Sequence, residues 1–191
     1  LDGNDTINVI GDLLGSDGNA AFVVDFGNGN NSLDASLNTD AGKAFIVTAG
    51  TGNDTLKGSA GEDNLNGASG DDSIDGGAGE DTLTGGAGAD ILNGDAGADL
   101  INGGTENDTI SGGSEIDTLN AGDGDDSVRG GDGNDLINGE DGNDLLYGDA
   151  GNDSILGGRG NDSIDGGAND DTISGERNDD LIKGGDGNDL L

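Results

Sequence analysis

Aspartate recurs at intervals of nine residues through most of the chain. From residue 49 to residue 191 the sequence divides into sixteen units with the pattern G-G-x-G-x-D-x-U-x, in which U is aliphatic and the last unit lacks its ninth residue. The sixth position is aspartate in every unit: Asp54, Asp63, Asp72, Asp81, Asp90, Asp99, Asp108, Asp117, Asp126, Asp135, Asp144, Asp153, Asp162, Asp171, Asp180 and Asp189. Because hard cations prefer oxygen ligands, this spacing predicts a regular array of candidate metal ligands.

Two other positions of the unit indicate what must hold these carboxylates in place. The eighth position is Leu, Ile or Val in all sixteen units. The fourth position is glycine in twelve units: Gly52, Gly61, Gly70, Gly79, Gly88, Gly97, Gly124, Gly133, Gly142, Gly151, Gly160 and Gly187. The exceptions are Glu106, Glu115, Asn169 and Asn178. Self-similarity at a fixed short period is typical of solenoids.

The unit predicts its own local structure. Its last three residues, such as residues 136–138, favour a very short strand whose middle side chain points inward. The six residues before them must turn the chain, and glycines there supply positive φ. Two units would then complete a coil of eighteen residues with one strand on each side. The sequence predicts an all-β solenoid of stacked coils, spaced at about 4.8 Å.

Charge decides how such a stack could stay folded. The units hold 34 acids and five bases, and their apolar core is one aliphatic side chain per nine residues. Stacking would place each aspartate column in register, where the carboxylates repel one another. Ca²⁺ takes six to eight oxygen ligands, from carboxylates and backbone carbonyls, whereas Mg²⁺ demands compact octahedral geometry and keeps its waters. Zn²⁺ is disfavoured because the chain has no His and no Cys.

A simple count supports this interpretation. If each ion bridges one unit and the unit two ahead, sixteen units make fourteen sites, and fourteen Ca²⁺ ions bring +28 against the net −29 of the units. Composition alone, with 43 Gly in 191 residues and a net charge of −35, is typical of a disordered chain. We therefore expect the array to fold only when calcium is bound.

The units resemble the haemolysin-type calcium-binding nonapeptide repeat of the RTX family. The resemblance covers residues 49–191, and units such as residues 148–156 (GDAGNDSIL) are close to its consensus. It implies a right-handed parallel β-roll, a form of β-helix, with Ca²⁺ between stacked loops. It also implies that the sixteen position-six aspartates bind calcium through their side chains, and that backbone carbonyls of the position-four glycines complete the sites. We expect weaker or distorted sites near Glu106 and Glu115, and at Asn169 and Asn178.

The resemblance also carries an expected function. It implies a module that folds on binding Ca²⁺ outside the cell, within a larger secreted or surface protein that a Gram-negative bacterium exports by type I secretion. Two alternatives remain open at this point: a structural segment of a surface-layer protein or adhesin, with cell-surface or self-assembly contacts, and an accessory domain of a secreted protease, lipase or epimerase. The chain begins without Met and ends inside a unit, so we interpret it as a fragment.

Several other functions are disfavoured. The net charge of −35 leaves no basic patch for nucleic acid. No phosphate-binding G-x-x-x-x-G-K-[ST] loop occurs. Adjacent acids such as Asp71 and Asp72 have places in the repeat that explain them, and the commonest catalytic groups, His and Cys, are missing. We therefore predict a protein that is not an enzyme.

Residues 1–48 depart from the frame. One unit survives around Asp5, and a second has Asn31 in the aspartate position. Residues 21–26 and 44–47 favour strands, and all three Phe lie in this segment. We interpret residues 1–48 as variant coils that cap or lead into the roll, because a solenoid needs atypical terminal units. Part of a separate upstream domain is the alternative.

The seventh position of the unit has one irregularity. It is mostly Thr, Ser or Asn, but it is apolar at three pairs that recur every 45 residues: Ile91 and Leu100, Leu136 and Leu145, and Leu181 and Leu190. A duplicated block of five units would explain them. The alternative is an exposed apolar stripe for packing or self-association.

Overall fold

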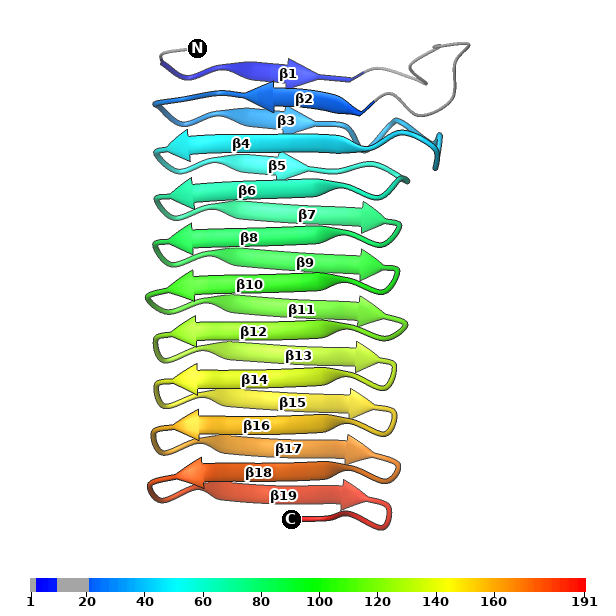
Figure 1. Cartoon of the computed structure of the whole chain (residues 1–191), viewed down its shortest axis with the longest axis vertical. Helices are drawn as coiled ribbons and strands as arrows, with labels where there is room; N and C mark the ends of the chain where they lie inside the picture. The colour runs from blue at the N-terminus through cyan, green and yellow to red at the C-terminus, as the bar shows by residue number, and fades with distance from the viewer. Residues whose placement is uncertain (1–2, 10–20) are drawn as a thin grey trace.

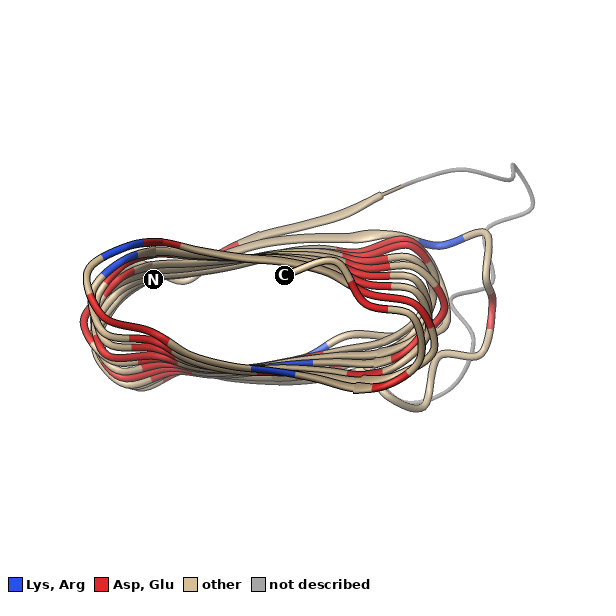
Figure 2. Ribbon diagram, turned by 90° about the horizontal axis from the view of Figure 1, so that it is seen from below, with Lys and Arg blue, Asp and Glu red and all other residues tan. Residues whose placement is uncertain are grey.

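The chain forms a flattened parallel β-solenoid of stacked coils (Figure 1). The computed structural model describes residues 3–9 and 21–191. Within these ranges there is no helix, and so none that is long and apolar enough to cross a membrane. Consecutive strands lie in opposite sheets, and each coil seen end-on is a flattened ring (Figure 2). The predicted all-β roll is confirmed, while its right-handed sense stays a prediction.

Nineteen described strands make the two sheets. The nine-stranded sheet contains β2 (Phe22–Asp25), β4 (Phe45–Thr51), β6 (Asn64–Ser69), β8 (Thr82–Ala87), β10 (Leu100–Thr105), β12 (Thr118–Asp123), β14 (Leu136–Asp141), β16 (Ser154–Arg159) and β18 (Thr172–Arg177). The ten-stranded sheet contains β1 (Thr6–Asn8), β3 (Ser32–Asp34), β5 (Thr55–Lys57), β7 (Ser73–Ala78), β9 (Ile91–Ala96), β11 (Thr109–Ser114), β13 (Ser127–Asp132), β15 (Leu145–Ala150), β17 (Ser163–Ala168) and β19 (Leu181–Asp186).

The strands pair in the register that two units per coil predict. From β4 onward each residue lies beside the residue eighteen further along, as Val47 does beside Leu65 and Ile137 beside Ile155. The position-eight side chains therefore stack in one column per sheet, and from Leu56 to Ile173 each is at most 3 % exposed. The core is a double file of aliphatic side chains between the sheets.

The predicted strand length was wrong. From β6 to β19 the strands have six residues, not three, because they continue through positions one to three of the following unit. In β14, Ile137 and Gly139 are both buried, so the alternation of inward and outward residues simply continues. Position one can point inward because it is glycine or alanine in every unit. Only positions four to six are left to make the turn.

The N-terminal coils extend the same two sheets with longer loops. Phe22 pairs with Phe45 and Ser32 with Thr55, at an offset of 23 residues, and Thr6 pairs with Ser32 at an offset of 26. Phe26 and Phe45 fill the core, each fully buried. This arrangement fits variant coils that lead into the roll. The boundary at residue 48 and the capping role stay predictions, and residues 1–2 and 10–20 lie outside the described part.

The apolar residues at position seven do not form a continuous stripe. They are exposed, but the members of each pair, such as Ile91 and Leu100, lie on opposite sheets. Within one sheet, Leu100 and Leu136 are separated by Thr118. Because a period of 45 residues is two and a half coils, the three pairs do not align in one apolar stripe; the duplicated block of five units stays a prediction.

Candidate metal centre

The turns at the two edges of the roll hold the aspartates in two columns. Figure 2 shows the acidic residues gathered at both ends of the flattened coil. One column precedes the strands of the ten-stranded sheet and the other precedes those of the nine-stranded sheet. The side chains of the aspartates from Asp54 to Asp171 are at most 3 % exposed, which is unusual for a charged residue. Asp180 and Asp189, in the last coil, are half-buried.

One oxygen of each carboxylate joins neighbouring coils. The Oδ1 atom accepts a hydrogen bond from the backbone N–H of the aspartate eighteen residues earlier, as Asp135 does from Asp117 at 2.9 Å. Fourteen such bonds of 2.7–3.1 Å run along the two columns. The N-terminal coils join the columns through Asn31 and Phe45, whose backbone N–H groups donate to Asp54 and Asp63. The aspartate therefore has a structural role that the repeat pattern did not reveal.

The other oxygen has no partner. In thirteen of the sixteen units the Oδ2 atom is buried and accepts no hydrogen bond: Asp54, Asp72, Asp81, Asp90, Asp99, Asp108, Asp117, Asp126, Asp135, Asp144, Asp153, Asp162 and Asp171. In Asp63 this oxygen accepts from Ser59 instead. An unpaired buried polar atom costs about 1–3 kcal/mol, and more when it is charged. Thirteen of them in one chain point to a missing positive partner.

Asn31 identifies what the unpaired oxygens face. It occupies the aspartate position, and its Oδ1 accepts from the N–H of Asp5 at 3.0 Å, as an aspartate would. Its Nδ2 donates to the carbonyl oxygens of Gly29 at 2.8 Å and Ala49 at 3.3 Å. These are position four of the same turn and position one of the next coil. Replacing that amide by a carboxylate oxygen puts three oxygens together with no hydrogen between them.

The glycines at position one support this geometry. A Cβ added to Gly130 would contact Asp135 Oδ2 and would lie 2.8 Å from the carbonyl oxygen of Gly148 in the next coil. The same pair of oxygens, from the aspartate and from position one of the next coil, meets the glycine in ten units: Gly58, Gly85, Gly94, Gly103, Gly112, Gly130, Gly139, Gly148, Gly157 and Gly166. These carbonyls were not among the predicted ligands. The sequence did contain a signal for this close approach, because the residue at position one is never larger than alanine.

The environment of the turns disfavours charge in the absence of a cation. Burial, and secondarily the stacked carboxylates, raise the pKa of Asp81 to about 8. The same causes raise the pKa of Asp72, Asp108, Asp117 and Asp144 to about 7. The Oδ1 hydrogen bond acts in the opposite direction but is outweighed. A bound divalent cation would reverse this balance and favour the charged form.

The donor set fits Ca²⁺ better than other metals. Within residues 3–9 and 21–191 no three acidic side chains come close enough to hold a metal by themselves. A cation in these turns must therefore take backbone carbonyls beside its carboxylates, which is the mixed oxygen shell that Ca²⁺ accepts. The carbonyls at positions four and one, converging with Oδ2, provide it.

The four turns without glycine keep the columns intact. Glu106, Glu115, Asn169 and Asn178 take φ values of 73° to 86°, a left-handed conformation that costs a non-glycine residue energy. The bond from Asp90 to Asp108 across the Glu106 turn is nevertheless 2.8 Å long. The aspartate column is thus unbroken there, and the expectation of weaker sites at these turns stays a prediction.

Position five supplies a second ladder that sequence reasoning missed. Its Asn or Asp side chain accepts a hydrogen bond from the backbone N–H of position five in the next coil. Asn134 accepts such a bond from Asn152 at 2.7 Å, and Asn152 accepts one from Asp170 at 2.9 Å. This ladder runs along the outside of the turns, opposite in direction to the aspartate ladder. The high content of Asn and Asp at position five was its signal.

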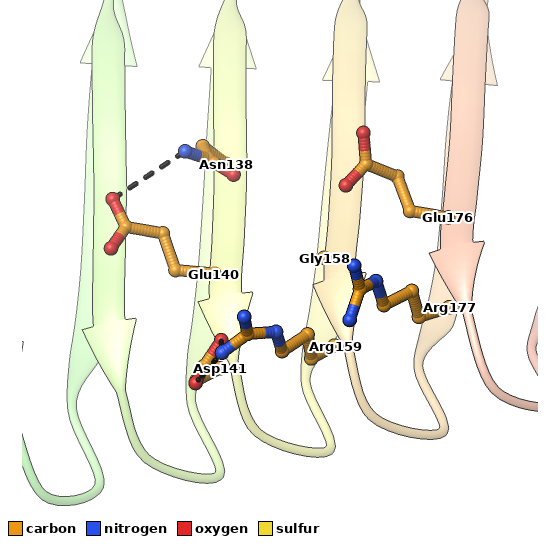
Figure 3. A pocket seen from close by; sticks show the side chains of 7 residues that line it. All are labelled: Asn138, Glu140, Asp141, Gly158, Arg159, Glu176 and Arg177. Carbon is orange, nitrogen blue, oxygen red and sulfur yellow. Dashed lines mark hydrogen bonds and ion pairs between the residues drawn. The ribbon is translucent and has the colours of Figure 1, made fainter.

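A separate hollow lies on the face of the nine-stranded sheet (Figure 3). It has a volume of about 400 Å³, and Gly158 forms its floor between Glu140 and Glu176. Arg159 pairs with Asp141 at 2.8 Å across the hollow's edge, and both side chains are about half exposed. The hollow is open, of mixed charge and away from the turns, so it is not part of the candidate centre.

Comparison with known proteins agrees with this site. A family model described as RTX calcium-binding nonapeptide repeat (4 copies) matches overlapping stretches that together span residues 48–191: 48–83, 67–101, 75–110, 102–137, 111–146, 129–164, 147–182 and 165–191. No curated protein matches the chain. The family match covers all thirteen units whose aspartate has an unpaired Oδ2 atom. It does not cover the N-terminal coils before residue 48.

Proposed function

The chain belongs to the RTX calcium-binding nonapeptide repeat family, and on that premise we propose that its turns bind Ca²⁺ between successive coils and that this binding folds the roll. The observation that carries the proposal is the row of thirteen buried Oδ2 atoms without partners. Each of these atoms occupies the position that Nδ2 has in Asn31, where it donates to two carbonyl oxygens. A cation satisfies all three oxygens at once.

Named residues would hold the ions. The position-six aspartates would supply Oδ2, the position-four residues would supply carbonyls of the same turn, and the position-one residues would supply carbonyls of the next coil. The bound ion contributes positive charge between stacked carboxylates. We expect about one ion per unit, fourteen in all if each ion joins two coils. Because only the folded chain brings these groups together, calcium affinity and folding stability are linked.

The linkage suggests where the module works. Extracellular calcium modules bind at about 10⁻⁴–10⁻³ M, so a chain of this kind stays unfolded where calcium is scarce and folds where it is abundant. We propose that the module belongs to a larger protein exported in the unfolded state through a type I secretion system of a Gram-negative bacterium, and that it acts outside the cell or on its surface. Its proposed role is structural and not catalytic.

A structural segment of a surface protein is the second candidate. The stacked coils form an elongated body with β1 and β19 at opposite ends (Figure 1), which would give such a protein length. Calcium would stiffen this segment. Both candidates share the calcium site and differ only in the rest of the protein.

Isothermal titration with Ca²⁺ tests the proposal. We expect about fourteen ions per chain, bound with a large heat because folding accompanies binding, and little heat with the same concentration of Mg²⁺. Binding of only one or two ions, or equal binding of Mg²⁺, would contradict the proposed sites.

A further inference from the structure

The two coils of β2–β5, near the N-terminal end of the roll, differ from the coils that follow them (Figure 1). In the later coils an aspartate precedes every strand at both edges. In these two coils other residues stand in the same columns, as the strand register shows. Asn31 precedes Asp54 in one column, and Phe22 and Phe45 precede Asp63 in the other.

At the first edge, the contact between these two coils is complete without a cation. The backbone N–H of Asn31 donates to Asp54 Oδ1, which continues the aspartate ladder. Its Nδ2 donates to the carbonyl oxygens of Gly29 at 2.8 Å and Ala49 at 3.3 Å. The amide thus supplies hydrogen atoms at the place where the later turns have an unpaired carboxylate oxygen.

At the second edge, aromatic side chains replace the carboxylates. Phe22 pairs with Phe45 across the two coils, and the centroids of their rings lie 5.7 Å apart. Phe45 is fully buried, and so is Phe26, which follows β2. Burial of apolar surface is favourable and leaves no charge to neutralise. This contact therefore holds the two coils together without an ion.

The Asp63 turn satisfies its own carboxylate. Its Oδ2 accepts hydrogen bonds from the backbone N–H of Ser59 at 2.7 Å and from the Ser59 hydroxyl at 3.1 Å. Its Oδ1 accepts the N–H of Phe45 at 2.6 Å. Both oxygens therefore have partners, in contrast to the thirteen aspartates whose Oδ2 has none.

The backbone of Ser59 explains why this turn is different. Ser59 occupies position two of its unit, and in the other fifteen units the residue at this position has a positive φ. Five of those fifteen residues are not glycine, so the left-handed conformation there does not depend on residue type alone. Ser59 alone avoids it, and no other position-two N–H of the sixteen units donates to its aspartate. The chain has thus built a different turn at Asp63.

We propose that the turns of Asn31 and Asp63 bind no calcium, and that the coils of β2–β5 stay ordered without the ion and provide the end on which the calcium-bound coils fold. This inference rests on the proposed function and deepens it. In a solenoid each coil contacts only its neighbours, so folding can spread from one ordered end. The ions then begin at Asp54 on one edge and at Asp81 on the other. The fourteen sites of the sixteen units become thirteen, one for each unpaired Oδ2.

The metal-free part is limited to these two coils. Asp5, in the coil before them, keeps a buried Oδ2 without a partner, as the later aspartates do. The units after Asp63 make up most of the chain, so the far-ultraviolet spectrum in chelator is still dominated by unfolded residues.

Hydrogen exchange of the full 191-residue chain tests the inference. In chelator at neutral pH, we expect the backbone amides of β2–β5 to exchange at least about tenfold more slowly than those of β7–β19, because only the former keep their hydrogen bonds. In calcium both groups should be protected. The aromatic residues give a second readout, since all three Phe lie in these two coils and the single Tyr, Tyr147, lies in β15. Near-ultraviolet circular dichroism should show the Phe bands in chelator and the Tyr band only with calcium.

Two variants should convert the metal-free turns into calcium sites. Asn31→Asp replaces the Nδ2 donor by an oxygen that faces two carbonyls, and Ser59→Gly permits the left-handed backbone and removes the hydroxyl from Asp63. Native mass spectrometry in calcium should count one more ion for each variant than for wild type. In chelator, Asn31→Asp should also lose the slow exchange of β2–β5. The matched control Asn30→Asp adds the same charge at the neighbouring exposed position and should do neither.

The possible failures of the inference and of the proposed function are distinguishable. If calcium folds the wild-type chain but the amides of β2–β5 exchange in chelator as fast as those of the later coils, the inference is wrong while the proposed function stands. The same holds if neither Asn31→Asp nor Ser59→Gly binds more ions than wild type. If wild type binds no calcium, or is protected throughout in chelator, the proposed function itself fails.

Discussion

Asp135 offers a test of why the turns need a cation. Its Oδ1 accepts the N–H of Asp117 at 2.9 Å, and its Oδ2 is buried without a partner. Asn31 shows that an amide in this position can keep the first bond and donate to the carbonyls with its Nδ2. We therefore expect Asp135→Asn to replace one calcium ion by a hydrogen-bond donor, whereas Asp135→Ala removes both interactions.

The two variants should separate clearly. In saturating calcium, Asp135→Ala leaves the Asp117 N–H and the carbonyls of the turn unsatisfied, which costs about 1–3 kcal/mol of folding free energy. Asp135→Asn should lose one bound ion but less stability than Asp135→Ala, by a difference of about that size.

Urea unfolding followed by circular dichroism in saturating calcium measures the difference in stability, and equilibrium dialysis counts the ions. The reasoning would be refuted if Asp135→Asn were no more stable than Asp135→Ala in calcium. It would also be refuted if Asp135→Asn bound the same number of ions as wild type. Either result would mean that the Oδ2 atom does not face a cation.

Three further predictions concern protons, packing and surface charge. Burial, and then the neighbouring carboxylates, raise the pKa of eight turn aspartates, to about 6 at Asp90 and to about 8 at Asp81. The stability that these groups give the metal-free fold is fully present below about pH 4 and is lost as pH rises through their raised pKa values; circular dichroism of calcium-free protein from pH 4 to pH 8 should show unfolding, and a flat profile would contradict it. Gly130→Ala should weaken calcium binding at its turn, because the new Cβ would meet Asp135 Oδ2 and lie 2.8 Å from the Gly148 carbonyl; an unchanged calcium midpoint would count against this contact. Arg159→Ala breaks an exposed ion pair with Asp141 and should change the free energy of unfolding by less than about 1 kcal/mol, which denaturant titration can verify.

Most of the fold could be predicted from the sequence because single positions of the repeat determine its main features. The aliphatic residue at position eight predicted the inward side chain, and its period predicted two units per coil, which the offset of eighteen residues confirms. The strand length could not be read from the same columns. Glycine at position one is typical of a turn, and only the packed coil shows that Gly139 points inward within a strand.

The candidate site was predicted in part. The position-six aspartates lie together in two columns, as their spacing indicated. The sequence could not reveal that the two oxygens of Asp135 have different roles, because this depends on which backbone N–H the neighbouring coil presents. The offset of 23 residues at Phe22 and Phe45 was equally hidden, since an insertion in a loop leaves no mark on the strands it connects. The hydrogen bond that Glu106 accepts from the Gly88 N–H depends on the direction of its side chain, which no repeat pattern specifies.

The central claim is that this chain folds because its turns bind calcium. Circular dichroism during a calcium titration at neutral pH tests it most directly. We predict a spectrum typical of an unfolded chain in chelator, a cooperative gain of β-structure as Ca²⁺ reaches the millimolar range, and little change with the same concentration of Mg²⁺. A chain that is already folded in chelator, and whose spectrum does not respond to calcium, would contradict the account.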